Sequence, residues 1–372
     1  MTTAVSSFEG LGLSADMLAQ ITHAGYSQPT PIQHMAIPHG LAGQDVIGCA
    51  QTGTGKTAAF VIPIIERLAG GSGTRALILV PTRELAMQVE KVVDQLGRRR
   101  GIGATLIVGG ANMQQQERGL RQNPEIIVGT PGRVLDHMWR GTINLLAIKI
   151  FVLDEADRLL DMGFAPQINQ ILDALPEDRQ TLLFSATMPE DIHALARTHL
   201  RHPVRVQVTS TGTTPAAAEQ KIFHATREQK NPLLCRLVKR EPGTALVITR
   251  TKSRADRVGQ MLADEGVPTA VLHSNRTMGQ RREALEGFKR GKYRVLIATD
   301  IMARGIHVNG IAHVINYDMP HCPEDYVHRI GRTARAHAKG CASTFVTPEE
   351  RNQLRAIERL LGQTVPVARS LN

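Results

Sequence analysis

The chain has 372 residues, 42% hydrophobic and 21% charged, so it is long enough for two folded domains and too apolar for a disordered protein. Its longest apolar runs are strand-sized, which excludes a membrane-spanning helix, and its polar first ten residues lack the layout of a signal peptide. The four cysteines are scattered without a CxxC pair, so a disulfide framework is not expected and a cytoplasmic location fits.

The net charge of +10 is concentrated in the second half of the chain. Residues 1–208 hold 18 Lys and Arg against 19 Asp and Glu, a net charge of −1, whereas residues 209–372 hold 26 against 15, a net charge of +11. A basic face attracts polyanions by releasing their counterions. On charge alone, nucleic-acid binding and a solubilising surface are equally good interpretations.

Short apolar runs alternate with helical stretches along the chain. In the first half, strands are expected at Asp45–Cys49, Ala76–Val80, Ala104–Val108, Ile126–Gly129, Ile150–Asp154 and Thr181–Ser185, with helices such as Lys56–Leu68, Arg83–Leu96 and Met113–Arg121. In the second half, strands are expected at Gln220–Ala225, Ala245–Thr249, Thr269–His273, Val295–Thr299, His313–Tyr317 and Cys341–Val346, with helices at Lys252–Glu265, Gln280–Arg290 and Pro323–Ile330. This alternation predicts an α/β fold of parallel sheets with helices on both faces.

A segment without apolar periodicity separates the two halves. Thr209–Ala218 is rich in Thr, Gly, Pro and Ala and is typical of a linker. We therefore expect an N-terminal domain at residues 1–208 and a C-terminal domain at residues 219–372. Ligands of such sheets bind beyond the carboxyl ends of the strands, so the two domains are expected to form a cleft.

A glycine-rich loop follows the first expected strand and opens a helix. Its glycines allow backbone N–H groups to surround phosphate oxygens, and the helix N-terminus adds positive potential. Lys56 can reach the β- and γ-phosphates, and the Thr57 hydroxyl can bind Mg²⁺. Ala50 stands where the strict pattern has glycine. The predicted triphosphate site consists of Ala50, Gln51, Thr52, Gly53, Thr54, Gly55, Lys56 and Thr57.

An acidic group stands at the end of the expected strand Ile150–Asp154. Carboxylates at this end of a parallel strand face the ligand side of the sheet. Asp154 suits Mg²⁺ bound through water, and Glu155 suits orienting and deprotonating an attacking water. Alone, the pair would be interpreted as a polar helix start; beside a phosphate loop, it predicts hydrolysis.

Residues 154–157 spell DEAD, and about a dozen motifs from Phe8 to Arg335 resemble, in order, those of the DEAD-box RNA helicases of helicase superfamily two. The resemblance implies two RecA-like domains. Gly25–Gln33 resembles the Q motif of this family. The Gln33 amide can both donate to and accept from adenine, and Tyr26 can stack on the base, which favours ATP over GTP.

Further motifs of the first half lie just past expected strands and resemble the RNA-binding motifs of the family. Hydroxyls, backbone N–H groups and arginines at these places suit the sugar-phosphate backbone, which carries no sequence information. Each of them alone is also ordinary loop and cap chemistry. The implied RNA contacts are Pro81, Thr82, Arg83, Gly110, Thr130 and Arg133; Ser185 and Thr187 resemble the motif that couples ATP to RNA through Asp157.

The second half contains three motifs that resemble motifs four, five and six of the family. Arg250, Thr251 and Thr299 take the positions of RNA contacts, Gly305 and His307 those of ATP contacts, and His328 a coupling position. Arg332 and Arg335 resemble arginine fingers that act on the γ-phosphate. Their spacing places them about one helical turn apart, on one side.

The sequence departs from the family pattern at His307, where Asp is usual and would accept a hydrogen bond from the ATP ribose. An imidazole has a different reach and is partly cationic near neutral pH, so weaker ATP binding or domain closure is expected. Met278 stands where Gln is common. Ile248 and Ala334 stand where Phe and Gly are common, and these two departures are mild because both residues are apolar or small.

The resemblance implies an ATP- and Mg²⁺-dependent RNA helicase, a monomer close to bacterial members of the family, whose RNA is chosen by a partner protein or is generally structured RNA. ATP and RNA together close the domains, and backbone contacts bend the strand. Three alternatives remain. A DNA translocase is distinguished from an RNA helicase by comparing RNA with DNA as stimulators of ATP hydrolysis. An ATP-gated RNA clamp is distinguished by a strand-separation assay, because it would bind RNA without separating strands. A P-loop metabolic kinase leaves Arg332, Arg335 and the basic second half unexplained.

Overall fold

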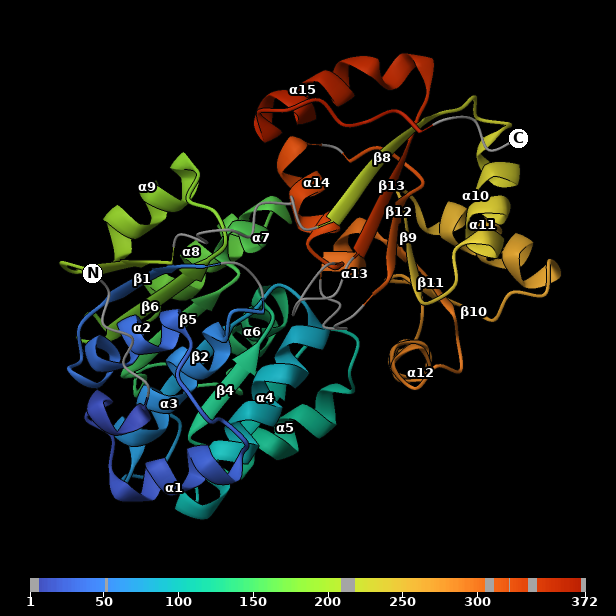
Figure 1. The fold of residues 1–372 in the computed structure, drawn as a ribbon. Helices are drawn as coiled ribbons and strands as arrows, with labels where there is room; N and C mark the ends of the chain where they lie inside the picture. Colours follow the sequence, from blue (N-terminus) through green and yellow to red (C-terminus); the bar gives the residue numbers. More distant parts are fainter. Residues whose placement is uncertain are drawn as a thin grey trace. The chain divides into compact units, whose positions relative to one another are not determined.

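The structure is a computed structural model that describes residues 7–50, 53–208, 218–304, 311–320, 322–333 and 340–368. The chain divides into two compact units, Met1–Ser210 and Thr211–Asn372, which are the first and the second domain (Figure 1). The expected linker falls at this division, and its residues 209–217 lie outside the described part of the chain. Among the described residues, no helix combines the length and the apolar character needed to span a membrane.

The first domain is built on a seven-stranded sheet with the order β3-β4-β2-β5-β6-β1-β7, in which every neighbouring pair is parallel. The register aligns the ends of its central strands, since Cys49 pairs with Ser185 and Asp154 with Phe184. Loops that follow these strands therefore meet at one edge. The strands are β1 (Val46–Cys49), β2 (Ala76–Leu79), β3 (Ala104–Ile107), β4 (Ile126–Gly129), β5 (Ile150–Asp154), β6 (Gln180–Ser185) and β7 (Val204–Gln207).

Helices cover both faces of this sheet, so the residues of its central strands β2, β4, β5 and β6 are all buried, whereas the edge strands β3 and β7 are only partly buried. Val46 and Ile78 belong to one core cluster, with α2, α3 and α4, while their neighbours Ile47 and Leu77 belong to the other, with α6, α7, α8 and α9. The helices are α1 (Ala15–His23), α2 (Pro31–Leu41), α3 (Lys56–Leu68), α4 (Arg83–Gly97), α5 (Met113–Arg121), α6 (Pro131–Trp139), α7 (Ala156–Asp161), α8 (Ala165–Asp173) and α9 (Glu190–His199), with short 3₁₀ helices at Phe8–Leu11 and Arg98–Arg100.

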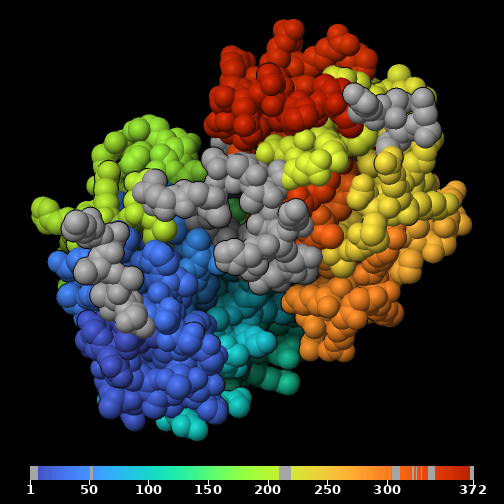
Figure 2. Space-filling view, viewed as in Figure 1, coloured from blue at the N-terminus to red at the C-terminus, as the bar shows by residue number. Residues whose placement is uncertain are grey.

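The second domain holds a six-stranded parallel sheet with the order β10-β11-β9-β12-β13-β8. Helix α15 packs against α14 and presents most of its residues to solvent, as the red surface in Figure 2 shows. The strands are β8 (Ala218–His224), β9 (Ala245–Thr249), β10 (Thr269–Leu272), β11 (Val295–Thr299), β12 (His313–Asn316) and β13 (Gly340–Val346). The helices are α10 (Lys230–Arg240), α11 (Lys252–Asp264), α12 (Met278–Lys289), α13 (Asp300–Arg304), α14 (Pro323–Ile330) and α15 (Arg351–Leu361), with a 3₁₀ helix at Pro348–Glu350.

The predicted fold class is confirmed, because both domains are parallel sheets flanked by helices. All twelve expected strands form, and each boundary lies within two residues of its expected position. The sequence reasoning missed β7, an edge strand of four residues in which only Val206 is buried. A short strand with one buried side chain has too weak an apolar alternation to stand out from a loop.

Candidate functional site

The glycine-rich loop lies between β1 and α3, and α3 begins at Lys56 as expected. Gly53 and Gly55 have φ values of +88° and +92°, which a residue with a side chain rarely adopts. The Lys56 ammonium is buried and donates to the backbone oxygen of Ala50 at 2.7 Å, across the loop. Thr57 lies half-buried in the first turn of α3, while Gln51 and Thr52 lie outside the described residues.

Gln33, in the first turn of α2, contacts this loop directly. Its Oε1 accepts from the Thr30 N–H at 2.9 Å, and its Nε2 donates to the Gly55 oxygen at 3.1 Å. A Cβ at Gly55 would lie 2.5 Å from that Nε2 and would displace the Gln33 amide, and the φ of +92° independently favours glycine there. Sequence reasoning gave Gln33 only a role toward adenine and missed this attachment to the phosphate loop. Tyr26 is partly buried against the core cluster that contains Val46 and Ile78, and burial raises the pKa of its hydroxyl.

The acidic pair lies at the end of β5, two strands away from β1 in the sheet. Both carboxyl groups are buried, with Asp154 2% and Glu155 3% exposed. Burial raises the pKa of Asp154 to about 7, and the positive charge of Lys56 acts in the opposite direction. Glu155 has a φ of +53°, an unfavourable conformation for a residue with a side chain, and it forms a buried ion pair with Arg158 that sequence reasoning missed.

Asp157 connects this acidic group to the end of β6. Its Oδ2 accepts from the Ala186 N–H at 3.1 Å, the Thr187 N–H at 2.9 Å and the Thr187 hydroxyl at 3.0 Å. Its own N–H donates to the Ser185 hydroxyl at 3.1 Å. The structure therefore brings together Asp157, Ser185 and Thr187, three residues that sequence reasoning placed in one coupling unit.

A second group of expected residues gathers where β2 and β3 end. Pro81 and Thr82 are buried, and Thr82 caps α4 by accepting from the Leu85 N–H at 3.3 Å. The guanidinium of Arg83 lies over Gly110, where an added Cβ would come within 2.2 Å of its Nη1. Gly110 also has a φ of +73°, so this close approach to Arg83 depends on glycine.

Thr130 and Arg133, after β4, join the same group. The Thr130 hydroxyl accepts from the Gly109 N–H at 3.4 Å, and Arg133 donates to the Ala111 oxygen at 3.0 Å. Arg133 also lies 3.4 Å from the carboxylate of Asp136. The carboxyl edge of the first sheet thus carries two neighbouring groups, one after β1, β5 and β6 and the other after β2, β3 and β4.

In the second domain, Arg250, Thr251 and Thr299 lie at the carboxyl ends of two paired strands. Thr299 ends β11 and pairs with Thr249 at the end of β9. Thr251 caps α11 by accepting from the Arg254 N–H at 3.2 Å. The side chain of Arg250 is 35% exposed, so it is partly open to solvent.

The arginines of the last motif have unlike surroundings. Arg329 is 1% exposed and makes a bidentate contact to Asp300, at 2.6 and 2.5 Å, with further bonds to the Asn316 side chain and the Asp318 backbone oxygen. Arg332 is buried but follows the end of α14 at Ile330. The helix ends at Ile330 as expected, and the expected placement of Arg332 and Arg335 one helical turn apart stays a prediction, because Arg335 lies outside the described residues. Arg335, Gly305, His307 and the His328 side chain lie outside the described residues.

The chain contains two parallel sheets, and the carboxyl edge of the first sheet carries a glycine-rich loop, a buried lysine and an acidic pair. This combination is typical of the P-loop nucleotide-hydrolase fold. Residues 30–195 match the DEAD/DEAH box helicase family, and residues 229–337 match the Helicase conserved C-terminal domain. The chain belongs to the DEAD/DEAH box helicase family.

Similar proteins agree with this assignment. The DEAD-box ATP-dependent RNA helicase CshA of Bacillus subtilis is 44% identical over 354 residues, which cover 95% of this chain and 72% of the relative. CshA of Geobacillus kaustophilus is 43% identical over 357 residues, covering 95% and 76%. Among solved structures, S. cerevisiae Dbp5 bound to RNA and ADP BeF3 is similar, with a TM-score of 0.87, 33% identity and coverage of 98% of this chain and 96% of that chain. The expected RecA-like fold is confirmed by this similarity.

Proposed function

We propose that this chain is an ATP-dependent RNA helicase that unwinds or remodels RNA duplexes by RNA-stimulated ATP hydrolysis and local strand bending. The observation that carries the proposal is the group at the ends of β1, β5 and β6, where Lys56, the acidic pair and the Asp157 network meet beside the phosphate loop. The relatives named as RNA helicases support RNA as the second ligand.

The nucleotide would be held mainly by the first domain. Backbone N–H groups of residues 53–57 and the Lys56 ammonium suit the phosphates, and Gln33 and Tyr26 suit the adenine. The Lys56 ammonium would exchange its bond to the Ala50 oxygen for phosphate oxygens, which removes a contact that now spans the loop. One N–H of the Gln33 amide is donated to the Gly55 oxygen, and the amide has a second hydrogen that suits an acceptor on adenine. Gln33 would therefore contact both the base and the phosphate loop.

The surroundings of the acidic pair suit a divalent cation. Asp154 is a buried carboxyl group whose charged form is disfavoured by desolvation, and a cation nearby would favour that form. Mg²⁺ would be held by Asp154 through water and by the Thr57 hydroxyl, and it would neutralise charge on the phosphates. Glu155 orients the attacking water and accepts its proton, after exchanging its contact with Arg158 for the water.

RNA would bind along its sugar-phosphate backbone, to Arg83, Gly110, Thr130 and Arg133 in the first domain and to Arg250, Thr251 and Thr299 in the second. Such contacts carry little sequence preference. By resemblance to the family, Arg332 and Arg335 stabilise the charge on the γ-phosphate, and Gly305 and His307 contact ATP. We further propose that the chain acts as a monomer in the cytoplasm, with its RNA selected by a partner protein or by RNA structure.

ATP turnover with and without RNA tests the proposal, alongside Glu155→Gln. RNA is expected to raise the turnover of the unchanged chain, and Glu155→Gln is expected to lower it about 10²- to 10⁴-fold, because a general base is lost. Glu177→Gln, the same change at an exposed residue, is the control and should leave turnover unchanged. Turnover that RNA does not stimulate would contradict the proposal. ATP-dependent RNA binding without strand separation would instead favour an RNA clamp.

A further inference from the structure

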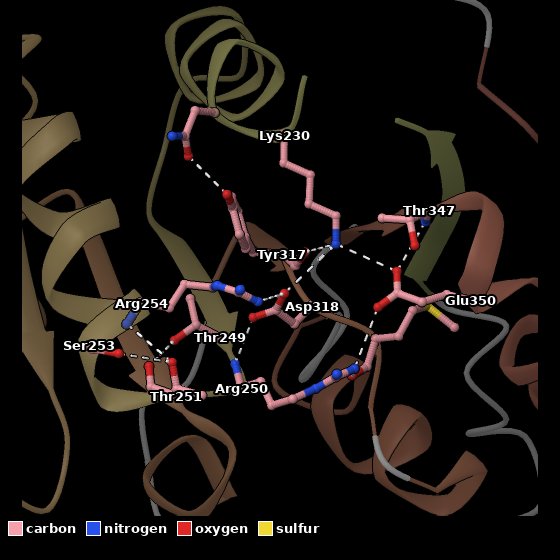
Figure 3. A network of polar contacts seen from close by, with 12 residues as sticks. Lys230, Thr249, Arg250, Thr251, Ser253, Arg254, Tyr317, Asp318, Thr347 and Glu350 are labelled. Atoms are coloured by element: carbon pink, nitrogen blue, oxygen red, sulfur yellow. Dashed lines mark hydrogen bonds and ion pairs between the residues drawn. The ribbon is translucent and has the colours of Figure 1, made fainter. Parts of the chain in front are cut away.

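Lys230, the first residue of α10, is a buried lysine that joins segments far apart in the sequence (Figure 3). It is 4% exposed, and its ammonium donates to the Tyr317 backbone oxygen at 2.9 Å. The same ammonium lies 3.7 Å from the Asp318 carboxylate and 3.5 Å from the Glu350 carboxylate. One cation thus connects α10 to the loop after β12 and to the turn before α15.

Both of these acids also hold the loop between β9 and α11. Asp318 accepts from the Arg250 N–H at 2.8 Å and from the Arg254 guanidinium at 2.7 Å. Glu350 lies 3.5 Å from the Arg250 guanidinium, which also donates to the Met319 oxygen at 3.3 Å. Figure 3 shows the two acids between the Lys230 ammonium and the Arg250–Thr251 loop.

The acids differ from Arg250 in their exposure. Asp318 and Glu350 have 3% and 14% of their side-chain surface exposed, whereas Arg250 has 35% exposed. A buried carboxylate is costly unless it is paired, and Lys230 is a cation that reaches both acids from the buried side. Without it, the two acids would draw the guanidinium of Arg250 inward, away from solvent, or lose their fixed positions.

We propose that Lys230 is a positioning residue for RNA binding: through Asp318 and Glu350 it fixes the backbone of Arg250 and Thr251 and keeps the Arg250 guanidinium available to an RNA phosphate. The inference rests on the proposed function, in which Arg250 and Thr251 contact the RNA backbone. Lys230 itself is too deeply buried to touch RNA. It acts on the affinity for RNA through the loop, rather than on the chemistry at the phosphate loop.

The same helix offers a matched control. Lys239 lies in the last turn of α10, has 54% of its side chain exposed and pairs with Glu265 at 2.6 Å. Lys230→Met and Lys239→Met remove the same charge from the same helix, so the general attraction of the basic domain for RNA falls equally in both. Any larger effect of Lys230→Met therefore comes from the network.

The experiment measures ATP turnover of the intact chain against the concentration of a single-stranded RNA of mixed sequence. Lys230→Met is expected to raise the half-saturating RNA concentration about tenfold, within the range of couplings found in hydrogen-bonded networks, and to change the turnover at saturating RNA less than threefold. Lys239→Met is expected to raise it less than twofold. Lys230→Arg, which keeps the charge, should restore much of the lost affinity.

A double-mutant cycle separates positioning from a loss of stability. In an Arg250→Ala background, Lys230→Met should raise the half-saturating RNA concentration less than threefold, because the residue it positions is gone. Equal effects with and without Arg250 would overturn the inference, as would a lowered turnover at saturating RNA with unchanged half-saturation. If Lys230→Met does not fold, Asp318→Asn takes its place, with the same expected increase and the same cycle.

The outcome for the unchanged chain keeps the two proposals apart. Turnover that RNA does not stimulate contradicts the proposed function. Turnover that RNA does stimulate, with Lys230→Met indistinguishable from Lys239→Met, contradicts the positioning role alone.

Discussion

The two domains use buried charge in opposite ways. At the carboxyl edge of the first sheet, Asp154 and Glu155 are buried acids, and burial raises the pKa of Asp154 to about 7. In the second domain, the buried charges include Arg329 and Lys230, whose acid partners Asp300 and Asp318 come from the same domain. Glu155 pairs with Arg158, but Asp154 is a buried carboxyl group whose charged form a bound cation would favour, whereas Arg329 and Lys230 pair with acids of their own domain and hold its loops in place.

The strongest test of this comparison is Arg329→Met. Removing the guanidinium leaves the Asp300 carboxylate without its bidentate partner, so the free energy of unfolding of the second domain should fall by about 3–5 kcal/mol. Hydrogen exchange of peptides from β12 and α14 measures the loss. Arg290→Met, at a residue with 80% of its side chain exposed, is the control and should cost less than about 0.5 kcal/mol. A loss below about 1 kcal/mol for Arg329→Met would show that this cation is not a structural one.

Lys56→Met should show the opposite pattern. The phosphates would lose a charged donor, so ATP turnover should fall about 10²- to 10³-fold, as when one donor to a developing anion is removed. The free energy of unfolding should change by less than about 1 kcal/mol, because Asp154 can take up a proton when the nearby positive charge is gone. Turnover and urea unfolding measure the two effects, with the exposed Lys91→Met as control. A large loss of stability with modest loss of turnover would remove the contrast between the domains.

The stability of the second domain should depend on pH, because this domain contains a buried histidine, His313. Burial lowers the pKa of His313 on β12 to about 4, with a smaller contribution from the charge of Lys221. In the unfolded chain, the imidazole of His313 is protonated below its ordinary pKa of about 6.5, whereas in the folded chain it is protonated only below about pH 4. This group's contribution to stability is therefore complete above pH 6.5 and falls by up to about 3 kcal/mol as the pH drops to 4.

Replacing His313 tests that interpretation. His313→Gln should flatten the part of the stability curve between pH 6.5 and 4, measured by hydrogen exchange of β12 and β13 peptides. The exposed His224→Gln in the same domain should leave the curve unchanged. Equal slopes in the unchanged chain and in His313→Gln would mean that other groups cause the acid sensitivity.

The sequence predicts strands and the phosphate loop better than it predicts side-chain networks. Strands buried on both faces stand out as apolar runs between turns, and the loop is a contiguous motif whose glycines are needed by the backbone. Gln33 is in a recognised motif, yet its bond to Gly55 depends on how α2 packs against α3, which no spacing along the chain records.

The second domain illustrates the limit more sharply. Arg329 and Arg332 stand three residues apart in one motif. Their spacing does not show that Arg329 binds Asp300, whereas Arg332 is the one expected at a phosphate. Lys230 lies in no motif identified in the sequence, and its partners Asp318 and Glu350 follow 88 and 120 residues later. Such contacts become visible only when the loops that carry them are placed in space.

The smallest expected effect concerns His307, which lies outside the described residues and is argued from resemblance alone. If the second domain contributes to the hold on ATP, His307→Asp should supply an acceptor for the ribose hydroxyl. We expect the half-saturating ATP concentration, measured at saturating RNA, to fall about three- to tenfold, which corresponds to roughly 1 kcal/mol for one added hydrogen bond. His224→Asp, which makes the same change at an exposed residue of the same domain, should leave it unchanged. No gain in His307→Asp would mean that residue 307 does not limit ATP binding, and the expectation of weaker ATP binding at this departure from the family pattern would be wrong.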